Sequence, residues 1–183
     1  MEKNNEAARG TKIRKEVFSW MRILLFAIAA AFIINNVLIV NAAVPSGSML
    51  NTIAAPSRLV AFRLSYMFSE PERFDVVVFR YPNDESVLHV KRVIGLPGEQ
   101  VDIIGGQVFI DGSVTPLDEW YLLEMPWNEN LSFEVPQDHF FVLGDNRNHS
   151  HDSRLWEGSS YLPRQNILGR AAFSYFPSFG IIR

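Results

Sequence analysis

The chain has 183 residues, enough for one domain and a short extra segment. Its 17 basic and 20 acidic residues give a net charge of −3 at pH 7, and the acidic excess falls after residue 22. This balance argues against nucleic acid as a partner, because nucleic-acid binding needs a basic face. Cysteine is absent, so a hydrophobic core must stabilise the fold without disulfides.

The N-terminal segment predicts a membrane anchor. An apolar stretch begins at Val17, and no charged residue occurs from Ile23 to Ser57. Its length reaches roughly the 20 residues that a helix needs to cross a bilayer core. Basic residues dominate before it, and basic flanks stay in the cytoplasm. We therefore expect a cytoplasmic N-terminus over residues 1–16, a transmembrane anchor over residues 17–42 and an extracytoplasmic domain over residues 43–183.

A cleavable secretory signal is the alternative interpretation of this segment. Small residues at Ala42 and Ala43 offer a cleavage site. The apolar stretch is long for a signal core, which favours the uncleaved anchor.

The remainder of the chain is predicted to be mainly β. Short runs of β-branched and aromatic residues alternate with turn residues, and no further segment has a long helical period. The fold class expected is a coiled antiparallel sheet or open barrel that follows the N-terminal helix. The strand candidates are residues 59–68, 74–80, 87–94, 101–104, 107–110, 140–143 and 167–173.

A serine and a lysine are candidates for catalysis. In Ser46-Gly47-Ser48 the glycine allows a bend that turns the Ser48 hydroxyl outward, although such a bend alone is usually a plain loop. Strand alternation puts Lys91 and Arg92 on opposite faces, and the ordinary interpretation is two solvated charges. If Lys91 points inward, burial lowers its pKa from about 10.4 to about 8, at a cost of about 3 kcal/mol. The resulting neutral amine could deprotonate a serine.

Polar residues are dense from Gly144 to Arg154, beyond what a surface turn requires. We expect the charged side chains of this run to pair with one another and to fix the loop. The four histidines leave a Ser-His-Asp triad open, with Asp145 or Asp152 as the acid. The histidines on either side of Ser150 could also bind a metal, although no acidic-histidine helix motif supports such a site. The histidines are His89, His139, His149 and His151.

In chain order, these motifs closely resemble the type I signal peptidases, in particular the compact bacterial form with one anchor. The matching stretches are Pro45–Met49, Asp75–Phe79, Val90–Glu99 and Gly144–Arg154, and the resemblance covers about residues 17–176. It implies a membrane-anchored serine endopeptidase that removes signal peptides from exported preproteins. The implied location is the plasma membrane, with one pass and the catalytic domain outside. The implied partners are preproteins, the lipid bilayer and the secretion translocon, and no metal or other cofactor is implied.

The resemblance also implies roles for individual residues. Ser48 is the nucleophile and Lys91 the general base, while Ser46 and the Ser48 N–H stabilise the oxyanion and Ser150 orients the lysine. Phe79 and Val142 match positions that pack apolar surface against that lysine. The residues implied as scaffold are Arg92, Asp145, Arg147, Asp152 and Arg154. The substrate is expected to lie extended against a strand edge. The candidates for its shallow apolar pockets are Met49, Leu50, Val76 and Val78.

Four features depart from the family pattern. Asn51 replaces a proline, which we expect to loosen the turn behind Ser48, and Phe74 replaces a glycine. His89 replaces an aromatic residue, and a charged His89 is expected to lower the pKa of Lys91. The link over residues 156–163 is longer than usual.

Two other functions stay open on the residues alone. One is a serine–lysine protease of the self-cleaving phage-repressor type, against which the anchor argues. The other is a membrane-tethered β module that binds peptides or cell wall without catalysis. Cleavage of a preprotein that requires both Ser48 and Lys91 would separate the signal peptidase from both.

Overall fold

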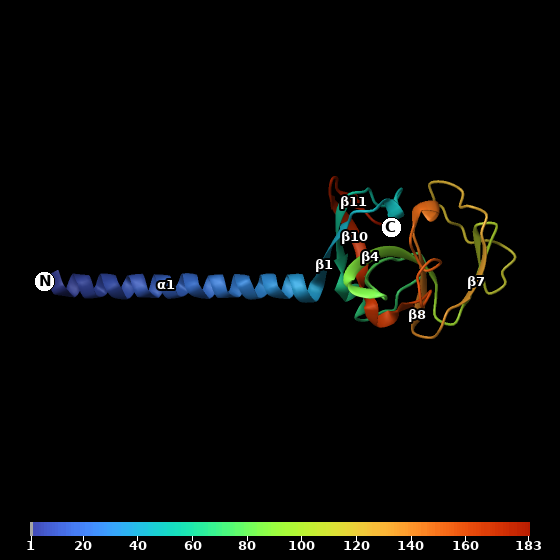
Figure 1. Cartoon of the computed structure of the whole chain (residues 1–183). Coiled ribbons are helices and arrows are strands. Elements are labelled where there is room, and N and C mark those ends of the chain that lie inside the picture. Colours follow the sequence, from blue (N-terminus) through green and yellow to red (C-terminus); the bar gives the residue numbers. More distant parts are fainter. Residues whose placement is uncertain (1) are drawn as a thin grey trace. The chain divides into compact units, whose positions relative to one another are not determined.

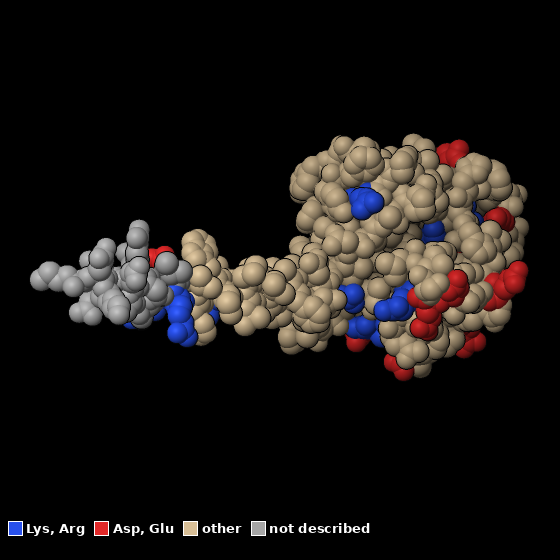
Figure 2. All heavy atoms as spheres, turned by 60° about the vertical axis from the view of Figure 1, so that its left-hand side comes forward, with Lys and Arg blue, Asp and Glu red and all other residues tan. Residues whose placement is uncertain are grey.

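The computed structural model describes residues 2–183, with side chains from residue 14 onward. It divides into two compact units, with the boundary in the chain between Leu38 and Ile39. The first contains helix α1, Glu2–Ile33, which continues as a π-helical turn over Ile34–Leu38. The segment Arg14–Leu38 is long and apolar enough to cross a membrane. Figure 2 shows the part of α1 beyond Arg22 without charged side chains.

Two asparagines interrupt the apolar segment where the α-helix changes to the π-helical turn. The Asn35 side-chain amide donates a hydrogen bond of 3.0 Å to the Ala31 carbonyl, and Asn36 donates one of 2.9 Å to the Phe32 carbonyl. Each amide thus has a backbone partner one turn earlier. This pairing lowers the cost of placing a polar side chain in an apolar environment.

The second unit is built from two antiparallel sheets (Figure 1). The larger sheet has the order β1-β2-β10-β3-β4-β8-β9, with β11 paired to β10, and the smaller has the order β6-β5-β7. Strands of the larger sheet are β1 Ile39–Val44, β2 Ser57–Phe62, β3 Val76–Tyr81, β4 Asp84–Gly95, β8 His139–Leu143, β9 Leu162–Pro163, β10 Ile167–Phe176 and β11 Gly180–Ile181. Those of the smaller sheet are β5 Gln100–Ile104, β6 Gln107–Ile110 and β7 Asn130–Glu134. Short 3₁₀ turns cover Gly47–Met49, Arg63–Tyr66, Arg147–His149 and Arg164–Asn166.

β4 is the longest strand among the described residues, and its two faces pack into different clusters of buried apolar side chains. Val93 joins an apolar cluster with Val77 and Phe79, whereas Ile94 joins another with Val101 and Phe141. The alternation follows from the two-residue period of a strand. β4 is therefore buried on both faces at its C-terminal end, and this is where Lys91 and Arg92 lie.

The predicted class, mainly β with an N-terminal apolar helix, is confirmed, and the large sheet stays open because β1 and β9 are its two ends. Of the expected run 59–68, only the part up to Phe62 is strand. Strand β1 was not predicted, since residues 39–42 were assigned to the anchor. Val40, Ala42 and Val44 alternate inward against β2. Small apolar residues suit either a membrane helix or a buried strand, so composition alone could not separate the two.

Candidate active site

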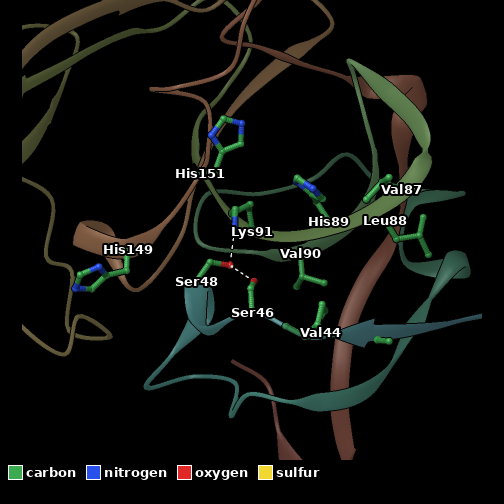
Figure 3. Close-up of a pocket in the computed structure, with 12 residues that line it drawn as sticks. Val44, Ser46, Ser48, Val87, Leu88, His89, Val90, Lys91, His149 and His151 are labelled. Atoms are coloured by element: carbon green, nitrogen blue, oxygen red, sulfur yellow. Dashed lines mark hydrogen bonds between the residues drawn. The ribbon is translucent and has the colours of Figure 1, made fainter.

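Ser48 and Lys91 are brought together from distant parts of the chain (Figure 3). Ser48 lies in the 3₁₀ turn after β1, and Lys91 lies on β4; both are buried. Lys91 Nζ is 2.6 Å from Ser48 Oγ. The Ser46 hydroxyl donates a hydrogen bond of 3.3 Å to the same oxygen. This geometry is suited to transfer of a proton from the serine to a neutral amine.

The surroundings of Lys91 favour the neutral amine. Burial lowers the pKa of Lys91 to about 8, and the negative charges of Asp152 and Asp145 offset part of that effect. Val77 pairs with Lys91 across the sheet and belongs to the same buried cluster as Phe79 and Val142. An apolar cluster therefore lies on the face of the sheet that carries Lys91.

The pair opens into a cleft of about 410 Å³. On one side lie β1 and the residues after it, and on the other lies the part of β4 before Arg92. β1 is an end strand, and β8 pairs with β4 only from Arg92 onward, so the two strand edges have no partner strand among the described residues. The lining residues are Ala43, Val44, Pro45, Ser46, Ser48, Val87, Leu88, His89, Val90, Lys91, His149 and His151.

The four residues predicted to form the substrate pockets do not line this cleft. Met49, Val76 and Val78 are at most 2% exposed, and Leu50 is not among the residues that line the cleft. The first three pack in one core cluster with Val44 and Val90, which do line it. The period of two in β3 turns Val76 and Val78 into the core, and tertiary packing covers them with the cleft wall.

Ser150 lies beside the pair, but its predicted bond to Lys91 is absent. Its Oγ is buried and makes no hydrogen bond with any described residue. It packs against Gly144, where an added Cβ would lie 2.2 Å from Ser150 Oγ and 2.6 Å from the Ser48 carbonyl oxygen. Gly144 therefore permits the polar loop to approach the nucleophile. Asn146 completes the contact, with its backbone N–H 3.0 Å from the Ser48 carbonyl oxygen.

Arg92 and Asp145 form the buried support behind the site. Arg92 donates two hydrogen bonds to the Asp145 carboxylate, at 2.8 and 2.6 Å. The Thr52 hydroxyl donates to the same carboxylate and accepts from Arg92 at 3.2 Å. The Arg92 guanidinium also lies over the Tyr121 ring, 4.1 Å from its centroid. This network joins β4, the turn after Ser48 and the polar loop.

The charges of the polar loop pair mostly outside the loop. Only Asp152 and Arg154 pair with each other, at 2.9 Å, while Arg147 pairs with Glu119. Arg154 also reaches Glu129 at 2.9 Å. The expected pairing within the loop is thus corrected, because the segment between β6 and β7 supplies two carboxylates. Glu119, Glu129, Thr52 and Gly144 are contributors that sequence reasoning missed as site residues.

The histidines do not form a triad. None of the four has a hydrogen bond to Ser48 among the described residues: His151 Nε2 lies 3.4 Å from the Tyr81 hydroxyl, and His139 Nδ1 lies 2.8 Å from the Gln137 carbonyl. Within residues 14–183 no three His, Asp or Glu side chains gather in a metal-binding group. The two-histidine site that the sequence left open therefore gains no third ligand.

Three departures from the family pattern have structural consequences. Asn51 has φ of 85°, which proline cannot adopt, and its amide donates 2.8 Å to the Tyr121 carbonyl, so the turn is anchored rather than loosened. Phe74 has φ of 73°, a conformation that suits the glycine it replaces. Burial and the charge of Lys91 lower the pKa of His89 to about 4. His89 is therefore neutral where Lys91 titrates, and the expected effect of its charge on Lys91 is corrected.

Comparison with known proteins shows the family to which this chain belongs. A model of "Signal peptidase, peptidase S26" matches residues 17–176. A signal peptidase I of Leptolyngbya laminosa is 44% identical over 142 residues, which cover 73% of this chain and 67% of that protein. A probable signal peptidase I-1 of Synechocystis sp. is 39% identical over 163 residues, which cover 85% and 81%. A crystal structure of a signal peptidase I from Enterococcus faecalis is 28% identical with a TM-score of 0.47, and it covers 56% of this chain and 97% of that one. Because the family model and these relatives span most of the chain, it belongs to the signal peptidase family, peptidase S26, whose enzymes remove signal peptides.

Proposed function

We propose that Ser48 is the nucleophile and Lys91 the general base of signal-peptide removal by this chain. The observation that carries the proposal is the 2.6 Å separation of Lys91 Nζ and Ser48 Oγ in a buried site that lowers the lysine pKa to about 8. Lys91 takes the hydroxyl proton while Ser48 Oγ bonds to the scissile carbonyl carbon. The Ser48 N–H and the Ser46 hydroxyl stabilise the oxyanion.

The attack forms a tetrahedral intermediate, and collapse of this intermediate breaks the peptide bond. Lys91 returns its proton to the leaving amine of the mature protein, and the signal peptide stays esterified to Ser48. Lys91 then deprotonates a water molecule that attacks the ester carbonyl, and it passes this proton to Ser48 Oγ as the signal peptide leaves with a new carboxyl group. The scaffold residues Arg92, Asp145, Arg147, Asp152 and Arg154 act by positioning this pair.

The cleavage region of the preprotein lies extended in the cleft between β1 and β4. Both strand edges offer main-chain groups to a substrate strand. Ala43, Val44, Val87 and Leu88 present small and branched apolar surface, which suits short side chains before the cut.

The chain sits in the membrane with one pass, its N-terminus inside and its catalytic domain outside. Residues 1–16 form the cytoplasmic part, residues 17–42 the anchor and residues 43–183 the peptidase domain; in the structure the candidate span ends at Leu38. The plasma membrane is the expected location, and the lipid bilayer and the secretion translocon are the expected partners. Exposed apolar residues such as Leu64, Met67 and Phe68 support contact with the bilayer surface.

The test of the chemistry is cleavage of a defined preprotein by the full chain in detergent, with the cut site read by mass. Wild type is expected to cleave, and both Ser48→Ala and Lys91→Ala are expected to be inactive. His149→Ala and His151→Ala should keep the cut site. If Lys91→Ala stays active while a histidine variant does not, a triad replaces the proposed pair.

The test of topology uses the absence of cysteine in the chain. Asn5→Cys and Ser113→Cys each add one thiol, which an impermeant maleimide can label in intact cells. Ser113→Cys should be labelled from outside and Asn5→Cys only after lysis. The reverse pattern would overturn the proposed orientation.

A further inference from the structure

We infer that Trp127 and His149 form a subsite for the first residues after the cut, and that Trp127 sets a preference for a large apolar or aromatic side chain there. This inference rests on the proposed function, because it takes Ser48 as the attacking group. It adds a contact with the leaving segment of the substrate.

The cleft extends to both sides of Ser48. In Figure 3, Val44 and Leu88 lie on one side of the serine and His149 on the other. The unpaired edges of β1 and β4 are on the first side, and this side suits the strand-like segment before the cut. The leaving segment must then pass His149, which is exposed and lines the cleft.

Trp127 does not itself line the cleft, but its ring contacts that of His149, which does. Their rings meet edge to face, with centroids 5.8 Å apart at 77°. The Trp127 side chain is 61% exposed, although tryptophan is usually covered in a folded domain. An exposed indole beside a lining residue of the cleft offers a broad apolar contact to a peptide that leaves past His149.

The backbone of Trp127 is held in place from two directions. Its N–H donates 2.8 Å to the Asn148 side-chain oxygen, and the Asn148 amide donates 2.8 Å to Glu124 and 3.2 Å to the Met125 carbonyl. On the other side the Trp127 carbonyl packs on Gly106, where an added Cβ would lie only 2.5 Å away. A fixed backbone beneath an exposed side chain is the arrangement of a preorganised binding residue.

The position of Asn148 links this subsite to the catalytic loop. Asn148 and His149 belong to the 3₁₀ turn that ends just before Ser150. Asn146, in the same polar loop, donates its backbone N–H to the Ser48 carbonyl. Trp127 is therefore fixed relative to the nucleophile even though it belongs to the segment between β6 and β7. Among the described residues, those that line this end of the cleft, His149 and His151, belong to the polar loop and not to a strand, so recognition there depends on side chains.

The experiment compares preproteins that differ only in the first two residues after the cut. One carries Ala-Ala, and two others carry Phe at the first or the second position. For full-length wild type we expect kcat/KM to be about two- to tenfold higher with Phe at one of these positions, the range of an aromatic contact. In Trp127→Ala, the ratio of kcat/KM for the preferred Phe substrate to kcat/KM for the Ala-Ala substrate should fall to about 1.

Matched variants separate this contact from a structural effect. Leu123→Ala removes an apolar side chain of similar exposure, 62%, from the same segment and should keep the wild-type ratio. Trp127→Phe should retain most of the preference, and Asn148→Ala should reduce it by releasing the segment.

Two results would overturn the inference. One is the absence of a preference in wild type, and the other is an equal loss of kcat/KM on all three substrates in Trp127→Ala, which would mean a structural role. Ser48→Ala serves as the reference. If it still cleaves, the proposed function fails; if it is inactive while the Trp127→Ala ratio is unchanged, only this inference fails.

Discussion

Lys91 and Arg92 are adjacent on β4, yet Lys91 contacts Ser48 and has no ion pair with any side chain from residue 14 onward, whereas Arg92 donates two hydrogen bonds to Asp145. The two-residue period of the strand separates them onto opposite faces. Arg92 forms a buried ion pair with Asp145, whereas burial lowers the pKa of Lys91. Two consecutive residues of the strand thus provide the proposed base, Lys91, and a member of the buried network behind the site, Arg92.

The activity is expected to rise with pH around a midpoint near 8. The reactive form of Lys91 is the neutral amine, and burial lowers its pKa to about 8. Below that pH the amine is protonated and cannot accept the Ser48 proton. The measurement is kcat/KM on one preprotein from pH 6 to pH 10. A flat profile, or a midpoint near the ordinary lysine value, would contradict the assignment of the base.

Lys91→Met is expected to be inactive but more stable than wild type at pH 7. The folded pKa of Lys91 is lowered, so between about pH 8 and about pH 10.5 the unfolded state binds more protons than the folded state. The stability contributed by this group therefore rises with pH across that window. At pH 7 the cost of burial is about 3 kcal/mol, which methionine would avoid. Urea unfolding of the full chain in detergent, at pH 7 and pH 10, checks both the sign and the window.

Exchange of Asp145 for asparagine should destabilise the fold strongly. It leaves the buried Arg92 charge without its partner, and loss of one member of such a pair costs about 3–5 kcal/mol. Arg92→Lys should also destabilise the fold, because an ammonium group cannot replace the two parallel hydrogen bonds of the guanidinium. Thermal or urea unfolding gives the size of the loss. Glu70→Gln is the control, since Glu70 is 74% exposed in its pair with Arg164.

Gly144→Ala should remove most activity, on the order of 100-fold, by pushing the polar loop away from Ser48. The added Cβ would lie 2.6 Å from the Ser48 carbonyl oxygen and 2.2 Å from Ser150 Oγ. Gly158→Ala is the control for general destabilisation, because its φ of 80° strains any side chain while nothing lies within 4 Å of the added Cβ. Preprotein cleavage and urea unfolding of both variants separate displacement from general destabilisation. Near-normal activity of Gly144→Ala would show that the close approach is dispensable.

His89→Phe is expected to leave the midpoint of the pH–activity profile unchanged. The pKa of His89 is lowered to about 4, and the residue is therefore uncharged where Lys91 titrates. Its ring stacks on Tyr81, with centroids 4.6 Å apart, and phenylalanine preserves that contact. A shift of the midpoint by about one pKa unit, or 1.36 kcal/mol, would restore an electrostatic role to His89.

Strong local patterns made most of the strands predictable. β3, β4 and β10 carry runs of β-branched and aromatic residues, and glycines bound the hairpin of β5 and β6. β7 has exposed residues along nearly all of its length, so its sequence lacks a buried face to reveal it. β1 was hidden because its small apolar residues continue the composition of the anchor. Prediction failed where burial, rather than residue type, decides the structure.

The sequence by itself determined which chemical groups are available: a serine on a glycine bend, a lysine one strand step from an arginine, and a polar loop, in the order of one family. These are local properties of composition and spacing. Tertiary structure decided which of them meet, because contacts such as Ser48 with Lys91 join a turn and a strand that are far apart in the chain. It also decided that Glu119 and Glu129 pair with the loop arginines, and that Met49, Val76 and Val78 lie in the core rather than on the cleft surface. Burial and pairing depend on what packs against a residue, and a single strand or loop does not contain that information.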